Sequence, residues 1–216
     1  MREASQKSSA PPAPGDSTSS ATRAPRRARG QLRVEALLAA AAEVFAQRGF
    51  DAATMTEIAA RSDSSIGSLY QFFKTKDAVA EAVLRAQLDA LWRRFDELAA
   101  RAAALSTPEL GRALAGLLAG FRTAHPSFAR LVDTPDVPHE LVADVRRHMR
   151  ARIVDVLASH RPAVDRATFV AMAPAVQQAM KAAIPLLAEF DGAERAAALG
   201  ELESMLAGYL AARLGG

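Results

Sequence analysis

Residues 54–76 read TMTEIAARSDSSIGSLYQFFKTK, and this stretch decides the fold. It holds two short segments with helical spacing of apolar residues, separated by the polar turn Ser62-Asp63-Ser64, and a third helical segment follows directly. Short polar side chains compete with helical hydrogen bonds, so the turn residues should end the first segment. This layout predicts a helix-turn-helix, whose second helix can enter the major groove of DNA. We therefore interpret the chain as a DNA-binding protein.

Three polar side chains predict where these helices begin. Thr54 is followed three residues later by Glu57, a spacing that predicts a reciprocal capping box at the first helix. Ser65 is expected to cap the second helix, and Thr75 the third. Together they divide the stretch into three helical segments with short connections.

The second helix is expected to have one buried and one exposed face. Leu69, Phe72 and Phe73 fall at helical spacing and should form the buried face. On the other face small residues let the backbone approach DNA, and Gln71 can bond adenine with both amide atoms. The residues of this stretch that we expect to contact DNA are Thr54, Thr56, Ser65, Ile66, Gly67, Ser68, Tyr70, Gln71, Lys74 and Lys76, the two lysines through phosphates.

Positive charge is concentrated at the N-terminus. Residues 1–30 have a net charge of +4, residues 31–80 a net charge of −1, and the remainder is neutral. The basic field therefore comes from the leader and not from the helix-turn-helix itself.

The leader is rich in Ser, Pro and Ala, and we expect residues 1–29 to form a disordered basic arm. A flexible basic arm next to a helix-turn-helix can reach the minor groove or neighbouring phosphates. On that basis Arg26, Arg27 and Arg29 join the expected DNA contacts. For residues 1–22 we favour the alternative, a solvated leader without a role.

The chain resembles the TetR family of bacterial repressors. Residues 34–50, VEALLAAAAEVFAQRGF, end in the Phe-Ala-x-Arg-Gly-Phe pattern typical of that family's first helix. Further hallmarks are Ile58-Ala59, Gly67-Ser68-Leu69-Tyr70 and Phe73-Lys74-x-Lys76. The joint pattern covers about a quarter of the chain and is specific, whereas any one piece would be weak.

Two positions depart from the family pattern, because its turn commonly reads Gly-Val where this chain has Asp63-Ser64. Asp tolerates the left-handed conformation better than most residues, so Asp63 can replace the Gly at modest cost. Ser64 replaces an aliphatic residue that is usually buried, which should loosen the packing between the two helices.

The composition predicts an all-α fold. Half of the 216 residues are hydrophobic, and no alternating strand pattern occurs. The chain has no cysteine, so it has no disulfide or thiolate metal site. The longest uncharged run, residues 167–180, is too short to span a membrane.

We expect a helix-turn-helix domain over residues 30–80 and a larger helical ligand-binding and dimerisation domain over residues 81–216. The predicted helices of the larger domain cover about Thr75–Ala104, Thr107 to His125 with Thr107 as the cap, Phe128–Val132, His139–Ser159, Arg166–Glu189 and Ala193–Arg213. Pro174 and Pro185 lie inside the next-to-last helix and should kink or split it.

The resemblance implies that the last two helices pair with their copies in a second subunit. The expected interface residues are Val176, Met180, Leu187, Leu199, Leu202, Leu206 and Tyr209. The alternative is that these faces belong to the core of a single subunit. A homodimer would present two reading helices to a palindrome, with half-sites ~34–36 Å apart.

The resemblance also implies release from DNA by a small-molecule effector, although the sequence does not itself show a ligand. The expected pocket walls are Trp92, Leu117, Phe121, His125, Phe128, His148 and Met149. The alternative is that each of these residues is plain core, which is the more frequent role for such side chains.

Catalysis is not expected. The chain has no Gly-rich phosphate loop and no Gly-x-Ser-x-Gly, and His139-Glu140 lacks the second histidine of a zinc helix. We expect no cofactor and no metal. We interpret the chain as a cytoplasmic bacterial repressor that binds double-stranded operator DNA and is then associated with the nucleoid. The alternative is a helical small-molecule binding protein that binds no operator.

Overall fold

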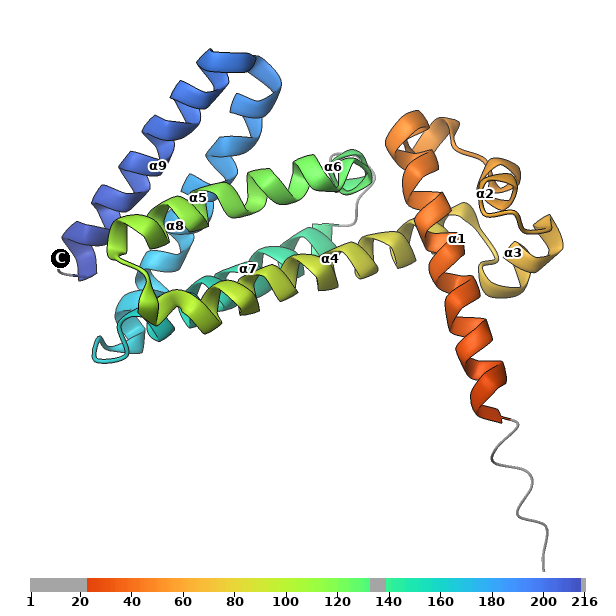
Figure 1. Cartoon of the computed structure of the whole chain (residues 1–216), viewed down its shortest axis with the longest axis horizontal. Helices are drawn as coiled ribbons and strands as arrows, with labels where there is room; N and C mark the ends of the chain where they lie inside the picture. Colours follow the sequence, from red (N-terminus) through yellow and green to blue (C-terminus); the bar gives the residue numbers. More distant parts are fainter. Residues whose placement is uncertain (1–22, 133–138, 215–216) are drawn as a thin grey trace, which may run out of the picture. The chain divides into compact units, whose positions relative to one another are not determined.

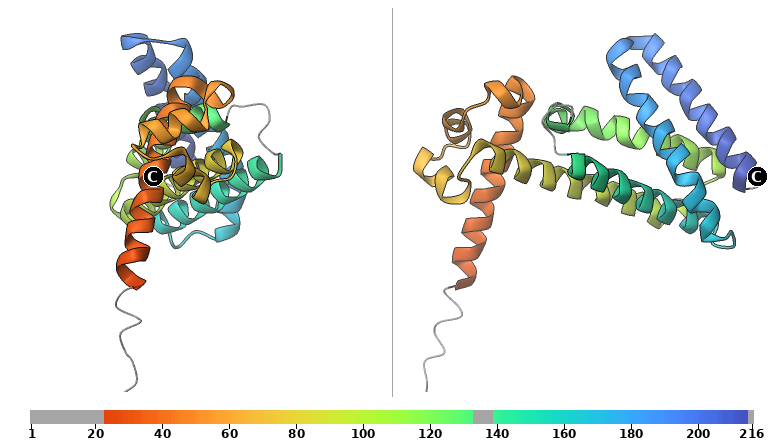
Figure 2. Two further views of the ribbon diagram at one scale, coloured as in Figure 1. Left: turned by 90° about the vertical axis from the view of Figure 1, so that its right-hand side faces the viewer. Right: turned by 180° about the vertical axis from the view of Figure 1, so that it is seen from behind.

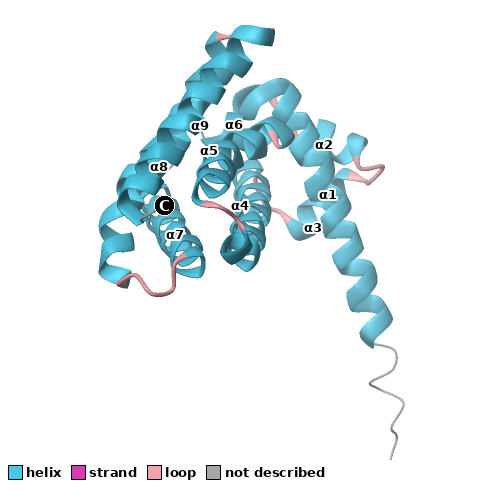
Figure 3. Cartoon of the chain, turned by 60° about the vertical axis from the view of Figure 1, so that its left-hand side comes forward, coloured by secondary structure: helices cyan, strands magenta, loops and turns pink. Residues whose placement is uncertain are grey.

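The computed structural model describes residues 23–132 and 139–214, and every regular element in these ranges is helical (Figure 3). The elements are α1 (Arg23–Ala52), α2 (Met55–Arg61), α3 (Ile66–Phe72), α4 (Lys76–Arg101), the short 3-10 helix η1 (Ala102–Ala104), α5 (Thr107–Ala124), α6 (Pro126–Val132), α7 (His139–His160), α8 (Arg166–Glu189) and α9 (Gly192–Leu214). The predicted all-α fold is confirmed. The predicted disorder of residues 1–22 lies outside the described residues.

The chain divides into two compact units, residues 1–36 and residues 37–216. The second unit contains both the helix-turn-helix and the larger helical domain. α4 continues without interruption across residue 80, where we expected one domain to end. The boundary at residue 80 therefore stays a prediction.

The N-terminal helix begins earlier than the sequence suggested. We expected disorder through residue 29, but α1 begins at Arg23. Ala and Arg are good helix formers, and Pro25 falls in the first turn, where its missing N–H breaks no helical hydrogen bond. Near its other end α1 is interrupted at Gly49, whose φ of 77° is costly for any residue with a Cβ.

A pair of long helices and a hairpin form the larger domain (Figures 1 and 2). α4 packs along α7, α5 packs against both α8 and α9, and α8 and α9 run antiparallel as a hairpin. One hydrophobic core continues from Leu37 to Leu214, and a smaller cluster forms around Ala119, Ala183 and Leu202. The larger domain is thus held together by contacts between residues far apart in the sequence.

α5 and α9 approach each other closely at Gly111. A Cβ placed on Gly111 would lie 2.5 Å from the Cα of Ala207 and 2.8 Å from its backbone nitrogen. Both partners are backbone atoms, which cannot move aside as a flexible side chain can. Glycine is therefore required at position 111 for the two helices to cross at this distance.

Two details of the larger domain differ from the sequence prediction. α8 is one helix from Arg166 to Glu189 and is not split, although Pro174 and Pro185 lie within it. Both prolines are exposed, so the carbonyl groups that they leave without a helical donor can reach water. The cap of α5 is Ser106 and not Thr107; Ser106 and Glu109 form a reciprocal capping box.

Thr107 has a different role. It is buried, and its hydroxyl lies 3.2 Å from Nε2 of His160, whose Nδ1 lies 2.9 Å from the carbonyl oxygen of Ala102. Because a carbonyl only accepts, Nδ1 carries the proton and Nε2 accepts from the threonine. His160 is thus a buried link between α5, η1 and α7.

Candidate functional site

The helix-turn-helix begins with the predicted capping box. The backbone N–H of Glu57 donates to Oγ1 of Thr54 at 3.2 Å, and the backbone N–H of Thr54 donates to the Glu57 carboxylate at 3.2 Å. Ser65 and Thr75 cap α3 and α4, accepting from the N–H groups of Ser68 and Ala78. All three predicted caps are confirmed.

Ion pairing and hydrogen bonding hold α2 against α1. The Arg61 guanidinium donates to Glu43 at 2.8 Å and to Gln47 at 3.1 Å. Ile58 and Ala59 are buried on the inner face of the same helix. Two kinds of contact therefore position α2 and the turn that follows it. Its apolar face is buried, and its polar face bonds to α1.

The turn between α2 and α3 has the backbone geometry that the sequence implied. Asp63 has a φ of 51°, the left-handed region that we expected it to adopt in place of glycine. The N–H of Ser64 donates to the carbonyl of Ala59 at 2.9 Å, and its hydroxyl donates to the carbonyl of Ser62 at 3.3 Å. Whether Ser64 loosens the packing stays a prediction.

Large apolar side chains are exposed on α3. The exposed fractions are 40% for Ile66, 44% for Tyr70 and 40% for Phe72. A Cβ built on Gly67 meets no atom within 4 Å, so the space above this glycine is open. Gln71 is also exposed. These side chains lie on a short, well-capped helix and give it a surface that another molecule can approach closely.

Two residues of α3 differ from the prediction. Phe72 was expected inside, but it is exposed, and Leu69 together with the half-buried Phe73 forms the inner face. Ser68 was expected to contact DNA, but it is only 8% exposed, and its hydroxyl has no hydrogen-bond partner. Ser68 lies with Leu69 on the buried side of α3. Only the other side of this helix is exposed to solvent.

Lys76 also has a different partner from the one expected. Its Nζ donates to the carbonyl oxygen of Asp51 at 2.9 Å and lies 4.5 Å from the centroid of the Phe50 ring. The lysine thus ties the start of α4 to the end of α1 and satisfies a terminal carbonyl there. Lys74 is exposed, and so are Thr56 and Ser65.

The remaining expected DNA contacts are spread over two elements. Arg26, Arg27 and Arg29 lie on the helical backbone of α1, and Arg29 is exposed. Thr54 is exposed, but its side chain is engaged in the capping box. Their expected contacts with DNA stay predictions.

The larger domain contains an apolar cavity of about 430 Å³ between α4, α5, α6, α7 and α8. Of the expected pocket residues, Phe128 and Met149 line this cavity. Gln177, buried in its wall, has its amide fixed by the Arg146 carbonyl at 3.1 Å and the Arg150 side chain at 3.0 Å. Lining residues that the sequence prediction missed are Leu84, Leu88, Leu118, Arg122, Val132, Val145, Arg146, Gln177, Lys181, Ile184 and Pro185.

The other five expected pocket residues are not part of this cavity. Leu117 and His125 line a separate groove between α4 and α5. Phe121 is fully buried, with its ring centroid 4.2 Å from that of His125 and 5.2 Å from that of Phe128. Trp92 packs against His148 at a centroid distance of 6.1 Å. The expected set therefore mixed two sites, because helical spacing shows which residues face inward but not toward which neighbour.

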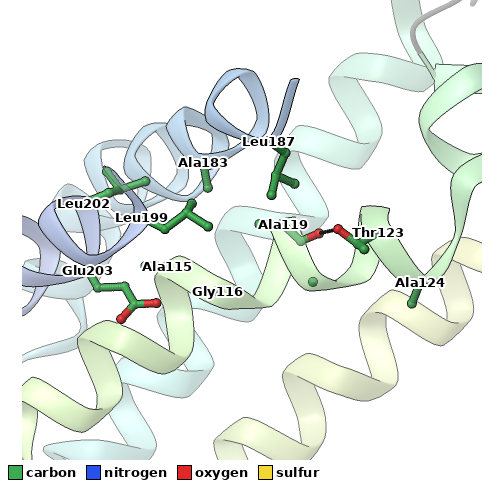
Figure 4. Close-up of a pocket in the computed structure, with 11 residues that line it drawn as sticks. Ala115, Gly116, Ala119, Thr123, Ala124, Ala183, Leu187, Leu199, Leu202 and Glu203 are labelled. Atoms are coloured by element: carbon green, nitrogen blue, oxygen red, sulfur yellow. Dashed lines mark hydrogen bonds between the residues drawn. The ribbon is translucent and has the colours of Figure 1, made fainter. Parts of the chain in front are cut away.

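Most of the expected dimer residues are occupied within the chain. Val176, Met180 and Leu206 are buried in its own core, which is the alternative that the sequence left open. Leu187, Leu199 and Leu202 line a cavity of about 360 Å³ between α5 and the α8–α9 hairpin (Figure 4). Tyr209 is half-buried and packs on the main core.

Other residues form the outer surface of the hairpin. Val170 on α8 and Met205 on α9 are 58% and 59% exposed, and the small residues Ala171, Ala175 and Gly208 of the same two helices are exposed as well. Of these small residues, Gly208 shares the helical face of Met205, because it follows three residues later.

Over the described ranges, no group of three His, Cys, Asp or Glu side chains is placed to hold a metal ion. None of the helices in those ranges has both the length and the hydropathy needed to cross a membrane.

Comparison with known proteins gives two family matches. Residues 37–83 match the bacterial regulatory proteins of the tetR family, and residues 106–210 match the tetracyclin repressor-like C-terminal domain. The first match covers α2, α3 and the adjoining parts of α1 and α4, and the second covers α5 to α8 and most of α9.

Among characterised relatives, the HTH-type transcriptional repressor KstR2 of Mycolicibacterium smegmatis is 42% identical over 66 residues, which are 31% of this chain and 32% of the relative. KstR2 of Mycobacterium tuberculosis is 32% identical over 130 residues, 56% of this chain and 62% of the relative. The chain thus spans between a third and 62% of the length of these curated relatives.

Solved structures agree on the fold. A TetR-like transcriptional regulator from Rhodococcus sp. RHA1 is 28% identical, with a TM-score of 0.56 over 85% of this chain and 97% of that one. FadR from Bacillus subtilis, solved in complex with stearoyl-CoA, has a TM-score of 0.58 over 80% of this chain and 97% of that one. At 12% identity the latter shows a shared fold only.

Proposed function

Because the chain belongs to the TetR family of bacterial regulatory proteins, we propose that it is a transcriptional repressor that binds a palindromic DNA operator as a homodimer. We propose further that a small molecule in the apolar cavity releases it from DNA. A family of regulatory proteins implies regulation and not catalysis as the activity of this chain.

The exposed face of α3 carries the proposal. Six large apolar side chains are exposed in the described ranges, and three of them, Ile66, Tyr70 and Phe72, lie on or at the end of this seven-residue helix. Exposed apolar side chains in one place mark a contact surface. The open space above Gly67 allows a sugar-phosphate backbone or a base edge to come near the helix.

The outer surface of the α8–α9 hairpin supports the homodimer. It combines exposed apolar side chains, Val170 and Met205, with small residues that allow helices to approach closely. A two-fold axis through such a surface makes the same patch contact its own copy. Two α3 helices would then be presented to half-sites ~34–36 Å apart.

The apolar cavity supports the effector. Its volume of about 430 Å³ falls within the range of small-molecule sites, and most of its lining is apolar. Leu84 and Leu88 contribute to its wall from α4, the helix that begins directly after the helix-turn-helix. A ligand that displaces α4 would therefore move the helix to which α3 is connected by only three residues.

The proposal is tested by footprinting the purified protein on the DNA that flanks its own gene, with the oligomeric state measured by sedimentation at the same concentration. The expected result is protection of a two-fold symmetric sequence by a dimer, with affinity falling steeply as salt rises. A folded dimer without a protected sequence at low salt would contradict the repressor and favour a helical small-molecule binding protein. A protected site that is not symmetric, bound by a monomer, would contradict the homodimer.

A further inference from the structure

The groove between α4 and α5, which Leu117 and His125 line, has a different chemistry from the apolar cavity. Its volume is about 820 Å³, and four arginines line it: Arg93, Arg94 and Arg101 from α4 and Arg112 from α5. We call this set the arginine groove. Glu97 is the only acidic residue among its lining residues, so the groove has a local charge of about +3.

Arg112 has an acidic neighbour, Glu109, whose pKa is lowered by hydrogen bonds at the helix cap and also by the charge of Arg112, but among the described residues no ion pair neutralises any of the four arginines. In the ranges that the structure describes, ion pairs involve other arginines, such as Arg61, Arg152 and Arg166, and none of the arginine-groove side chains takes part in one. Like charges placed along a concave surface focus a positive potential and attract anions. The groove therefore favours an anionic occupant over solvent alone.

The side chain of Arg94 packs on the aromatic ring of Phe121. Its guanidinium carbon lies 5.7 Å from the centroid of the buried Phe121 ring, and the His125 ring lies against the same phenylalanine. A guanidinium stacked on an aromatic face keeps its N–H donors available at the edge. Burial and the nearby Arg94 both lower the pKa of His125, so this ring adds little positive charge of its own at neutral pH.

The spacing of the arginines selects the form of the anion. Arg94 and Arg101 are seven residues apart on one helix, a separation of ~10.5 Å along its axis. Glu97 lies between them on the same face and repels an anion placed midway. Arg112 on the opposite wall can close over one end. The arrangement favours two anionic groups with a neutral part between them over one compact anion.

We propose that the arginine groove is a second ligand site, which binds a small molecule with two phosphate or carboxylate groups ~10 Å apart. Such a ligand would contact both α4 and α5. The site does not rest on the function proposed above, because the groove is separate from the apolar cavity and from α3.

The test is isothermal titration of the full-length protein with hexanediol bisphosphate, with hexanediol monophosphate and decanedioate as further arms. The groove variant is Arg94→Gln/Arg101→Gln. The control variant is Arg85→Gln/Arg147→Gln, which removes the same charge from exposed arginines outside the groove. Circular dichroism shows whether each variant keeps its fold.

The expected result is saturable binding of one bisphosphate per chain, weakened about tenfold or more in the groove variant and less than about twofold in the control. The monophosphate should bind at least about tenfold more weakly than the bisphosphate. Comparing bisphosphate with decanedioate identifies which anion the site prefers.

Equal losses in the two variants would show that binding follows total charge and would overturn the site. Absence of saturable binding by the wild type, or equal affinity for the monophosphate, would overturn it as well. A last arm titrates each variant with DNA that lacks the operator sequence. If the groove variant loses affinity for this DNA but not for the bisphosphate, the arginines contact nucleic acid and the proposed small-molecule site is wrong.

Discussion

The reading head, residues 53–76, and the helical body, α4 to α9, are specified in different ways. In the reading head each helix start is fixed by a partner three residues away, as with Thr54 and Glu57 or Ser65 and Ser68. In the body the decisive contacts join distant residues, such as Thr107 with His160 and Gly111 with Ala207. Local hydrogen bonds therefore make the head predictable from the sequence, whereas long-range packing decides where the cavities and surfaces of the body lie.

The largest effect is expected from Gly111→Ala in the body. The new Cβ would lie 2.5 Å from the Cα of Ala207, so α5 and α9 must separate. We expect the free energy of unfolding to fall by about 2–3 kcal/mol, measured by urea denaturation at fixed protein concentration.

The matched control is Gly120→Ala on the same helix, where a Cβ meets nothing within 4 Å. There the free energy of unfolding should rise by ~0.5–1 kcal/mol, since alanine is the better helix former. Equal effects at the two positions would show that the α5–α9 contact does not limit stability.

The next effect is expected from Thr107→Val, which keeps the shape of the side chain and removes its hydroxyl. Nε2 of His160 would then lack its threonine donor in a buried place. We expect a loss of about 2 kcal/mol in the free energy of unfolding. An unchanged urea midpoint would mean that another donor or water replaces the hydroxyl and that the link between α5 and α7 is not needed.

A smaller effect is expected in the head from Thr54→Ala, which removes the capping box of α2. The free energy of unfolding should fall by about 1 kcal/mol. Thr56→Ala serves as the control, because Thr56 is exposed and does not cap the helix. If the free energy of unfolding falls equally in both variants, the effect comes from removing a threonine in general and not from losing the cap.

The smallest effect is expected from Asp63→Gly in the turn, and its sign is opposite. Asp63 has a φ of 51°, a conformation in which glycine has no steric cost. The relief of strain should exceed the entropy that glycine loses on folding and should raise the free energy of unfolding by about 0.5 kcal/mol. A decrease would show that the aspartate side chain stabilises the turn.

The outcome of the sequence predictions follows the same division. In the head the capping box, the two further caps and the left-handed Asp63 were all predictable, because each depends on residues that are near in the sequence. The differences there, at Ser68 and Phe72, concern which way a side chain faces, which depends on α1 and α4 as well as on α3 itself.

In the body the helices were predictable, but the sites were not. Of the expected pocket residues, Phe128 and Met149 line the apolar cavity, and Leu117 and His125 line the arginine groove. Neither site is lined by Trp92, Phe121 or His148. Helical spacing identified Val176 and Met180 as apolar positions but could not show that the chain's own core covers them. Choosing among inward-facing neighbours requires the crossing of the helices, which sequence spacing does not contain.

The central claim is that the exposed face of α3 reads DNA. It is tested most directly by the affinity of the protein for its footprinted site, measured by fluorescence anisotropy for the wild type and for Tyr70→Ala/Gln71→Ala. Both side chains are exposed, so the urea midpoint should not change. If this face reads DNA, the variant should lose specific affinity by about tenfold or more, and its binding to unrelated DNA should not change. Equal affinity of the two proteins for the specific site would contradict the claim that this face reads DNA.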